Sequence, residues 1–272
     1  MRIRITHDTV YRYSTPVRAL IQVLRMSPLH HEGQFVARWD VRAEGDLRLK
    51  RREDWYGNTV HALSMAGPVN EICLRATGEV ETEDTSGVMR RTVERFPPAL
   101  FLRGTRLTES DAELAAFAAD TVSGISDPLE RMHALMGALH SRMAFDTGAT
   151  DVVTTAGEAF KSGHGVCQDF THIFLAAARG LGIPARYVSG YLYKPDEEEQ
   201  EATHAWTEAH ILGLGWTAFD PTNGICTTDG YVRVAVGLDY LDCAPVRGSF
   251  KGATVENMSV HLKITSAARS RT

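Results

Sequence analysis

Cysteine is scarce in this sequence, and its four copies, Cys73, Cys167, Cys226 and Cys243, form no C-x-x-C pair. In a reducing compartment, such scattered cysteines argue against disulfide bonds and against a structural zinc site. We expect Cys73, Cys226 and Cys243 to be small buried hydrophobic residues. Cys167 lies in a different setting, between a glycine-flanked turn and a segment with helical periodicity.

Long apolar runs are also missing. No stretch approaches the roughly 18 apolar residues that a transmembrane helix needs, so no membrane partner is expected. The first residues, MRIRITHDTVYRYS, alternate like a β-strand and lack the apolar centre of a signal peptide. We therefore expect no signal peptide and a cytoplasmic location.

Charge of one sign does not dominate either. The formal net charge is −5 and the pI is about 6.1, so the chain lacks the excess of positive charge that is typical of nucleic-acid-binding proteins. The basic run at 48–52 is typical of a solvated strand or turn face rather than of a phosphate-binding patch. The acidic run at 196–201 is expected to be a surface loop.

The first hundred residues have the pattern of a β-rich region. The runs RIRITH, FVARWDVRA, NTVHALSM and EICLRATGEVET alternate or favour β-branched residues, and turn sequences such as STP, YGN and GP separate them. The stretch Phe96, Pro97 and Pro98 closes this part of the chain. We predict a β-rich N-terminal domain at 1–100 and a second domain at 101–272.

Helices are predicted next. Thr108 with Asp111 resembles a capping box that opens a helix over 109–122, and Asp127 with Pro128 opens a second helix over 128–143. A short third helix is expected over 155–163. The second helix carries an apolar stripe that indicates core packing, formed by Leu129, Met132, Leu135, Met136 and Leu139.

A further helix is expected to start near Cys167 and to end at Gly180, before Gly182 and Pro184. Strands follow at 185–193, at 203–212 and at 215–222, the last two joined by a glycine-containing turn that is typical of a hairpin. The tail adds strand patterns at 232–241 and 257–267. A β-rich region followed by helices and an antiparallel sheet favours the α+β class.

Cys167 is a candidate nucleophile because it lies where the turn becomes the first turn of a helix. Exposed N–H groups and the positive end of the helix dipole favour a thiolate there. A buried structural cysteine at a helix start explains the same local pattern, so these residues alone leave both interpretations open.

The hairpin favours the catalytic interpretation. His204 lies in its first strand and Asp220 at the end of its second, so an antiparallel register can bring the two side chains together. An aspartate in that place orients the imidazole while the other ring nitrogen faces a thiol. A surface histidine and a loop aspartate would be the better interpretation if either residue stood alone.

Three sequence blocks resemble the transglutaminase-like superfamily of papain-type thiol enzymes. They are GVCQDFT with RGLGIPARYVSGY, then HAWTE, then WTAFDPTN, and they follow the family's order and spacing over 163–224. The sequences YRYSTPV and DWYGNTVH resemble the N-terminal region that accompanies this domain in bacterial members. The resemblance implies a papain-like, transglutaminase-like catalytic core, with a helix that carries the cysteine packed on an antiparallel sheet.

The resemblance also implies the roles of the three residues. Cys167 attacks a carboxamide carbon, His204 forms the thiolate–imidazolium pair and protonates the leaving amine, and Asp220 orients His204. The resulting thioester is released by water or by an amine. We expect a cysteine protease or amidase that acts on a protein or peptide substrate, without a cofactor or metal ion. The alternatives are a protein transglutaminase and a catalytically inactive peptide-binding module.

The sequence departs from animal transglutaminases, in which a tryptophan upstream of the cysteine helps to stabilise the oxyanion. No tryptophan lies between Trp55 and Trp206, which weakens transglutaminase specificity. The Cys167 N–H is one candidate oxyanion donor, and the second donor is open. The family's calcium sites cannot be placed in this sequence. Trp206, Trp216 and Tyr191 are expected to pack the sheet or to line the acyl groove.

A metal-binding protein is the rival of another class. It would use His164, Cys167, Asp169 and His172, whose side chains are suitable ligands. The five-residue step from Cys167 to His172 puts these two residues off a common helix face, which argues against such a site. For Asp169, a structural role as a first-turn carboxylate is favoured over catalysis.

Overall fold

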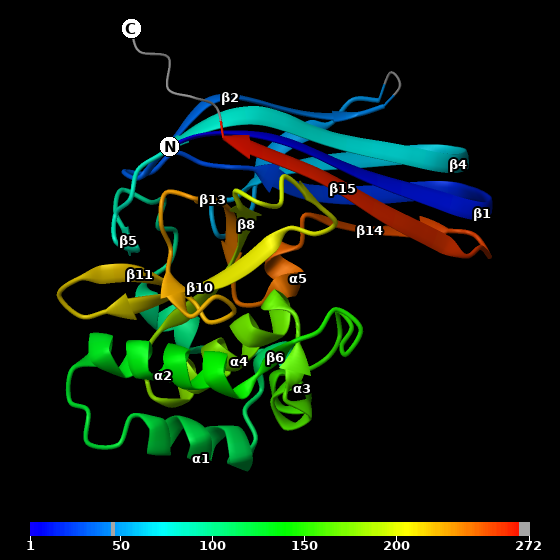
Figure 1. The fold of residues 1–272 in the computed structure, drawn as a ribbon. Coiled ribbons are helices and arrows are strands. Elements are labelled where there is room, and N and C mark those ends of the chain that lie inside the picture. The colour runs from blue at the N-terminus through cyan, green and yellow to red at the C-terminus, as the bar shows by residue number, and fades with distance from the viewer. Residues whose placement is uncertain (45–46, 267–272) are drawn as a thin grey trace, which may run out of the picture.

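The structure, a computed structural model, describes residues 1–44 and 47–266. Two largely antiparallel sheets and a group of helices build the molecule, and Figure 1 shows the N-terminal sheet above the second sheet, with the helices on the far side. This arrangement confirms the α+β class. Within the described ranges, no helix combines the length and the apolar character that crossing a bilayer requires.

The N-terminal sheet has the strand order β2-β4-β1-β15-β9, with β14 also paired to β1 and β3 to β4. Alternate side chains along the first half of β1 are buried, as its period-two pattern predicts. The bounds of these strands are β1 Arg2–Ser27, β2 Gln34–Ala43, β3 Lys50–Glu53, β4 Thr59–Thr82, β9 Glu199–Gln200, β14 Val246–Lys251 and β15 Glu256–Ser266.

The last strands of the chain return to this N-terminal sheet, since both β14 and β15 pair with β1. The sequence-based division groups them with 101–272 instead. Alternation of apolar and polar residues predicts a strand but does not name its partner, which is why the pairing could not be foreseen. Residues 267–272 of that predicted region lie outside the described residues, and the two domain limits stay a prediction.

The second sheet has the order β12-β11-β10-β8-β13, with β5 paired to β11. Its bounds are β5 Val88–Met89, β8 Ala185–Leu192, β10 His204–Ile211, β11 Gly215–Asp220, β12 Ile225–Cys226 and β13 Tyr231–Gly237. Strands β10 and β11 form the predicted hairpin, with Ile211 opposite Gly215 at the turn. The ends of β10 and β11 opposite this turn therefore carry His204 and Asp220.

Most of the α-helices begin where a capping side chain accepts a hydrogen bond from an N–H of the first turn. Asp127 accepts a hydrogen bond from the Glu130 N–H at 2.9 Å, as predicted. The first helix is capped by Asp111, which accepts from the Leu114 N–H at 2.9 Å, and not by Thr108, which ends a separate 3₁₀ turn. The bounds are α1 Ala112–Thr121, α2 Pro128–Arg142, α3 Ala156–Ser162, α4 Cys167–Gly180 and α5 Tyr240–Cys243.

Helix α4 is the centre of the core. Its residues from Gln168 to Arg179 are buried, and it packs against α1, α2 and α3 and against strands β8 and β10. A helix that is covered on all sides is fixed in position. The short parallel pair β6 (Ala144–Phe145) and β7 (His164–Gly165) holds the segment that enters α4. Together these elements fix the N-terminus of α4 relative to the hairpin.

A buried ionic network ties β8, β10 and β13 together. The Glu208 carboxylate accepts hydrogen bonds from Arg186 at 2.6 Å and from Arg233 at 2.7 Å. Arg186 also pairs with Glu94 at 2.8 Å, so its guanidinium bridges two carboxylates. The guanidinium of Arg186 stacks on Trp216, 4.0 Å from the ring centroid. This network braces the strand that carries His204.

Candidate active site

Cys167 is the first residue of α4 and directly follows Val166, whose backbone is extended. The Asp169 carboxylate folds back over this helix start and accepts hydrogen bonds from the Val166 N–H at 2.8 Å and from the Thr150 hydroxyl at 2.6 Å. Gly165 makes room for it, because a Cβ there would lie 2.7 Å from Asp169 Oδ2. Asp169 thus has a structural role at the first turn of the helix.

The half-buried Cys167 offers two groups for chemistry. Its Sγ lies 4.0 Å from the carbonyl oxygen of Thr203, the residue before β10. Its N–H has no hydrogen-bond acceptor within the part of the chain that the structure describes. A free N–H at the positive end of a helix dipole favours a thiolate and favours an oxyanion bound close to it.

His204 and Asp220 meet across the hairpin as the sequence predicts. The His204 Nε2 lies 2.6 Å from Asp220 Oδ2. The register pairs Thr207 with Phe219 and, continued by one step, puts Asp220 opposite Trp206. His204 and Asp220 are therefore diagonal neighbours on one face of the sheet, at a separation that side chains of this length can bridge.

The Asp220 carboxylate is fully buried and saturated with donors. Besides His204, its Oδ2 accepts hydrogen bonds from Asn223 Nδ2 at 2.6 Å and from the Tyr231 hydroxyl at 2.8 Å. Its Oδ1 accepts from the N–H groups of Thr222 at 2.9 Å and Asn223 at 3.2 Å. Burial raises the pKa of Asp220, but these contacts outweigh it and lower the pKa overall. The residue is held as an oriented anion.

His204 lies between this anion and the thiol. Burial lowers its pKa, but hydrogen bonds with Asp220 and with the Cys167 side chain, together with their charges, outweigh burial and raise the pKa from 6.5 to about 10. The imidazole is therefore held as an imidazolium at neutral pH. Its Nε2 faces Asp220, which leaves Nδ1 for the thiol. The structure brings together all three predicted residues, Cys167, His204 and Asp220.

A groove of about 880 Å³ opens over Cys167 and His204. Tyr187 and Tyr240 line it near the thiol, and Phe145, which is 60 % exposed, lines its outer part. The groove provides space for an extended polypeptide segment or a side chain beside the sulfur.

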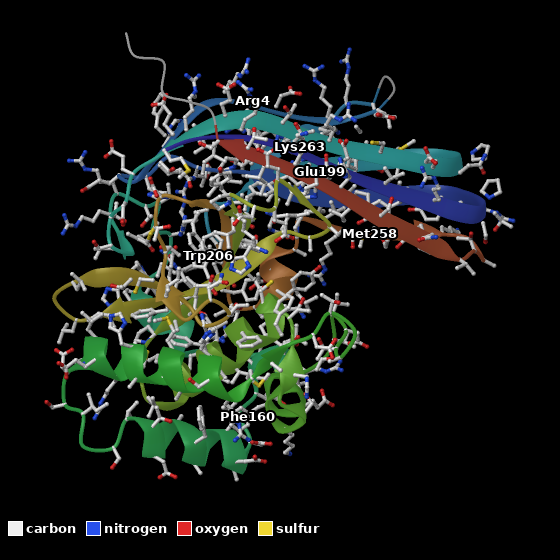
Figure 2. All side chains as sticks on the ribbon, in the orientation of Figure 1. Arg4, Phe160, Glu199, Trp206, Met258 and Lys263 are labelled. Carbon is white, nitrogen blue, oxygen red and sulfur yellow. The ribbon has the colours of Figure 1, made fainter. Side chains whose placement is uncertain are left out.

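The acidic segment predicted as a surface loop also lines this groove, through Glu197, Glu199 and Glu201. Strand β9 of this segment pairs with β15, and Lys263 lies 3.7 Å from Glu199. Figure 2 shows Glu199 and Lys263 side by side where the segment reaches the N-terminal sheet. The N-terminal sheet thus holds one wall of the groove in place.

The aromatic residues considered for the groove pack elsewhere. Trp206 is 2 % exposed and stacks on the His204 ring with centroids 6.2 Å apart. Gly190 permits this packing, because a Cβ there would lie 2.6 Å from the indole. Trp216 covers Arg186, and the Tyr191 hydroxyl lies 3.1 Å from His7 Nδ1. Trp206, labelled in Figure 2, therefore supports the His204 ring through its stacked indole face.

The four residues of the alternative metal site do not surround a common point. His172 is buried, and its Nε2 accepts a hydrogen bond from the Tyr240 N–H at 3.2 Å. Asp169 is engaged at the start of the helix, as described above. Over residues 1–44 and 47–266, no three histidine, cysteine or carboxylate side chains are gathered as a metal ion would need.

Comparison with known proteins decides the family. A family model described as "Transglutaminase-like superfamily" matches residues 115–221, and one described as "Bacterial transglutaminase-like N-terminal region" matches residues 3–81. An uncharacterized protein of Mycobacterium leprae is 31% identical over 98% of this chain and 99% of its own length. The chain belongs to the transglutaminase-like superfamily.

Other proteins are similar along most of the chain. An uncharacterized protein of Mycobacterium tuberculosis is 28% identical over 91% of this chain and 87% of its own length. The crystal structure of a "Putative Cysteine Protease" from Cytophaga hutchinsonii superposes with a TM-score of 0.79 at 23% identity, covering 99% of this chain and 92% of that one. The fold is thus shared over almost the whole chain.

Sequence reasoning missed two residues of the site. Asn223 and Tyr231 complete the shell around Asp220, yet they were not singled out. For Asn223 a signal existed, since it directly follows the D-P-T sequence of the third block. Tyr231 lies 11 residues beyond Asp220 and starts another strand, so its position near the carboxylate depends on the pairing of β13 with β8.

Proposed function

We propose that this protein cleaves peptide or isopeptide amide bonds through a thioester on Cys167. One observation carries the proposal: the His204 imidazolium is held between the Cys167 thiol and the buried, multiply hydrogen-bonded Asp220. A thiolate–imidazolium pair with an oriented base is what nucleophilic attack on an amide carbon needs.

The reaction would proceed in two halves. The Cys167 sulfur adds to the amide carbon, and the carbonyl electron pair moves to the oxygen. Collapse of this intermediate re-forms the carbonyl and expels the amine, which takes the proton from His204. In the second half His204 removes a proton from water, and the resulting attack on the thioester carbon releases the acid and the thiol.

Water is the favoured acceptor because the groove reaches the surface at Phe145, and because the upstream tryptophan of animal transglutaminases has no counterpart here. Transfer to an amine is the second candidate function. It is favoured by the carboxylates of Glu197, Glu199 and Glu201 along the groove, since negative charge raises the local concentration of a cationic amine.

A peptide library incubated with the wild-type protein and with Cys167→Ala tests the proposal. Mass spectrometry would score cleavage, and a biotinylated primary amine would score amine incorporation in the same tubes. We expect cleavage by the wild type that the variant lacks. Cleavage that persists in Cys167→Ala would refute the mechanism, and amine incorporation that exceeds cleavage would make amine transfer the main activity.

A further inference from the structure

The groove around Cys167 contains a hydroxyl group that has no role in the mechanism above. Tyr187 is a β8 residue that is 1 % exposed, yet it lines the groove together with Cys167. Within the described residues its hydroxyl makes no hydrogen bond, and the atom is not closed off from the groove. An unpaired donor beside a nucleophile is available for a group of the substrate.

The Tyr187 ring is held in a defined place. It packs on the His172 ring of α4 with centroids 5.3 Å apart and meets the Tyr240 ring edge to face at 6.4 Å. His172 is itself fixed, because its Nε2 accepts the Tyr240 N–H. The ring thus lies against the N-terminal half of α4, the part of the helix that starts with Cys167.

Several other polar side chains in the groove are already engaged. The Ser189 hydroxyl donates to the Cys243 carbonyl at 2.8 Å, and the Asn223 amide donates to Asp220 at 2.6 Å. The indole N–H of Trp206, the residue type that animal transglutaminases use, is buried away from the groove. Tyr187 differs from these residues because its ring is held rigidly by its neighbours while its hydroxyl has no partner in the described residues.

We propose that the Tyr187 hydroxyl is the second oxyanion donor, acting with the Cys167 N–H. This inference rests on the proposed thioester chemistry. When the sulfur adds to the carbonyl carbon, the carbonyl electron pair moves to the oxygen, which accepts hydrogen bonds from both donors. When the carbonyl re-forms, the electron pair returns and both donors keep their protons, so Tyr187 undergoes no net change.

The acid–base state of the phenol suits that task. Burial raises the pKa of Tyr187 well above its usual range, and the nearby charges of Cys167 and Cys243 raise it further. The phenol therefore stays protonated over the whole range in which the thiol reacts. A neutral donor stabilises the oxyanion without competing for the His204 proton.

Tyr187→Phe tests the role, with Tyr191→Phe as a matched control that removes another β8 phenol, one that contacts His7 outside the groove. N-acetylglycinal is a suitable probe, since its aldehyde carbon accepts the Cys167 sulfur and puts an oxygen in the oxyanion position. Its affinity is measured as protection of Cys167 from iodoacetamide, which requires no turnover. We expect Tyr187→Phe to weaken this protection about 10-fold to 100-fold and Tyr191→Phe to leave it unchanged.

The pH dependence of iodoacetamide labelling separates this role from stabilisation of the thiolate. The proposal predicts the same labelling profile for Tyr187→Phe and the wild type, and the same thermal stability, because the removed hydroxyl has no partner in the described chain. Unchanged protection in Tyr187→Phe, absent protection in the wild type, or a shifted labelling profile would each overturn it. Tyr187-dependent protection without any amide cleavage would refute the proposed function and leave the oxyanion site standing.

Discussion

The His204 imidazole and the Asp220 carboxylate are 2.6 Å apart although they are diagonal neighbours, and not directly opposed residues, of the hairpin. In this arrangement Trp206 is the residue directly opposite Asp220. The Trp206 indole stacks on the His204 ring. The imidazole is therefore fixed by a carboxylate at one nitrogen and by an aromatic face at its side. Its Nδ1 is left free of Asp220 and is available to the Cys167 side chain.

The raised pKa of His204 predicts the alkaline limit of activity. The imidazolium is the acid that protonates the leaving amine, so the rate should stay high through neutral pH and fall as pH rises through about 10. In Asp220→Asn this limit should move down toward the ordinary value of about 6.5, and kcat should fall by about 10²-fold to 10⁴-fold. A pH–rate profile of both proteins checks this. An unmoved alkaline limit in the variant would contradict the assignment of Asp220.

The same shift links pH to stability. A histidine whose pKa is raised on folding contributes stability that is fully present below its unfolded pKa of about 6.5. That contribution is lost as pH rises through about 10, the folded value. Denaturation at several pH values should show that the free energy of unfolding falls more between pH 6.5 and about 10 for the wild type than for His204→Gln. Equal losses would mean that the ion pair does not stabilise the fold.

Glu208→Gln should be strongly destabilising. The substitution leaves Arg186 and Arg233 buried beside a neutral amide, and breaking a buried ion pair costs about 3–5 kcal/mol. Glu201→Gln is the matched control, because Glu201 is exposed and should change stability by less than about 0.5 kcal/mol. Urea denaturation of the two variants gives the comparison. A Glu208 variant as stable as its control would show that the network is dispensable.

Gly190→Ala should disturb the support of the site. The added Cβ would meet the Val232 carbonyl oxygen and the Trp206 indole, so we expect about 1–3 kcal/mol of destabilisation and reduced activity. Gly137→Ala, in an open position of α2, should stabilise the protein by up to about 1 kcal/mol. Thermal unfolding and activity of both variants test this. Full activity in Gly190→Ala would argue against a role for the Trp206 packing.

Sequence reasoning placed Cys167, His204 and Asp220 near one another because each of them carries a local signal. Cys167 lies at a helix start with a turn before it, and His204 and Asp220 lie in a hairpin whose short turn limits the register. Local patterns of this kind determine where a residue lies in its own helix or strand. They also limit which residues of the adjacent hairpin strand it can contact.

Apart from Asn223, the features that were missed depend on longer-range pairing. Tyr231 reaches Asp220 only because β13 pairs with β8, and the acidic segment lines the groove only because β9 pairs with β15. The strand pattern at 257–267 likewise gave no indication that β15 pairs with β1. A period of two identifies a strand and its faces, and the choice of partner is decided by burial in the folded chain.

Intact-protein mass spectrometry of acid-quenched reactions tests the central claim most directly. During turnover of a cleaved peptide, the wild type should carry the acyl half of the substrate on Cys167, and hydroxylamine should remove it as expected for a thioester. Cys167→Ala should carry no adduct and have no activity. Turnover without an adduct, together with retained activity in Cys167→Ala, would contradict the account.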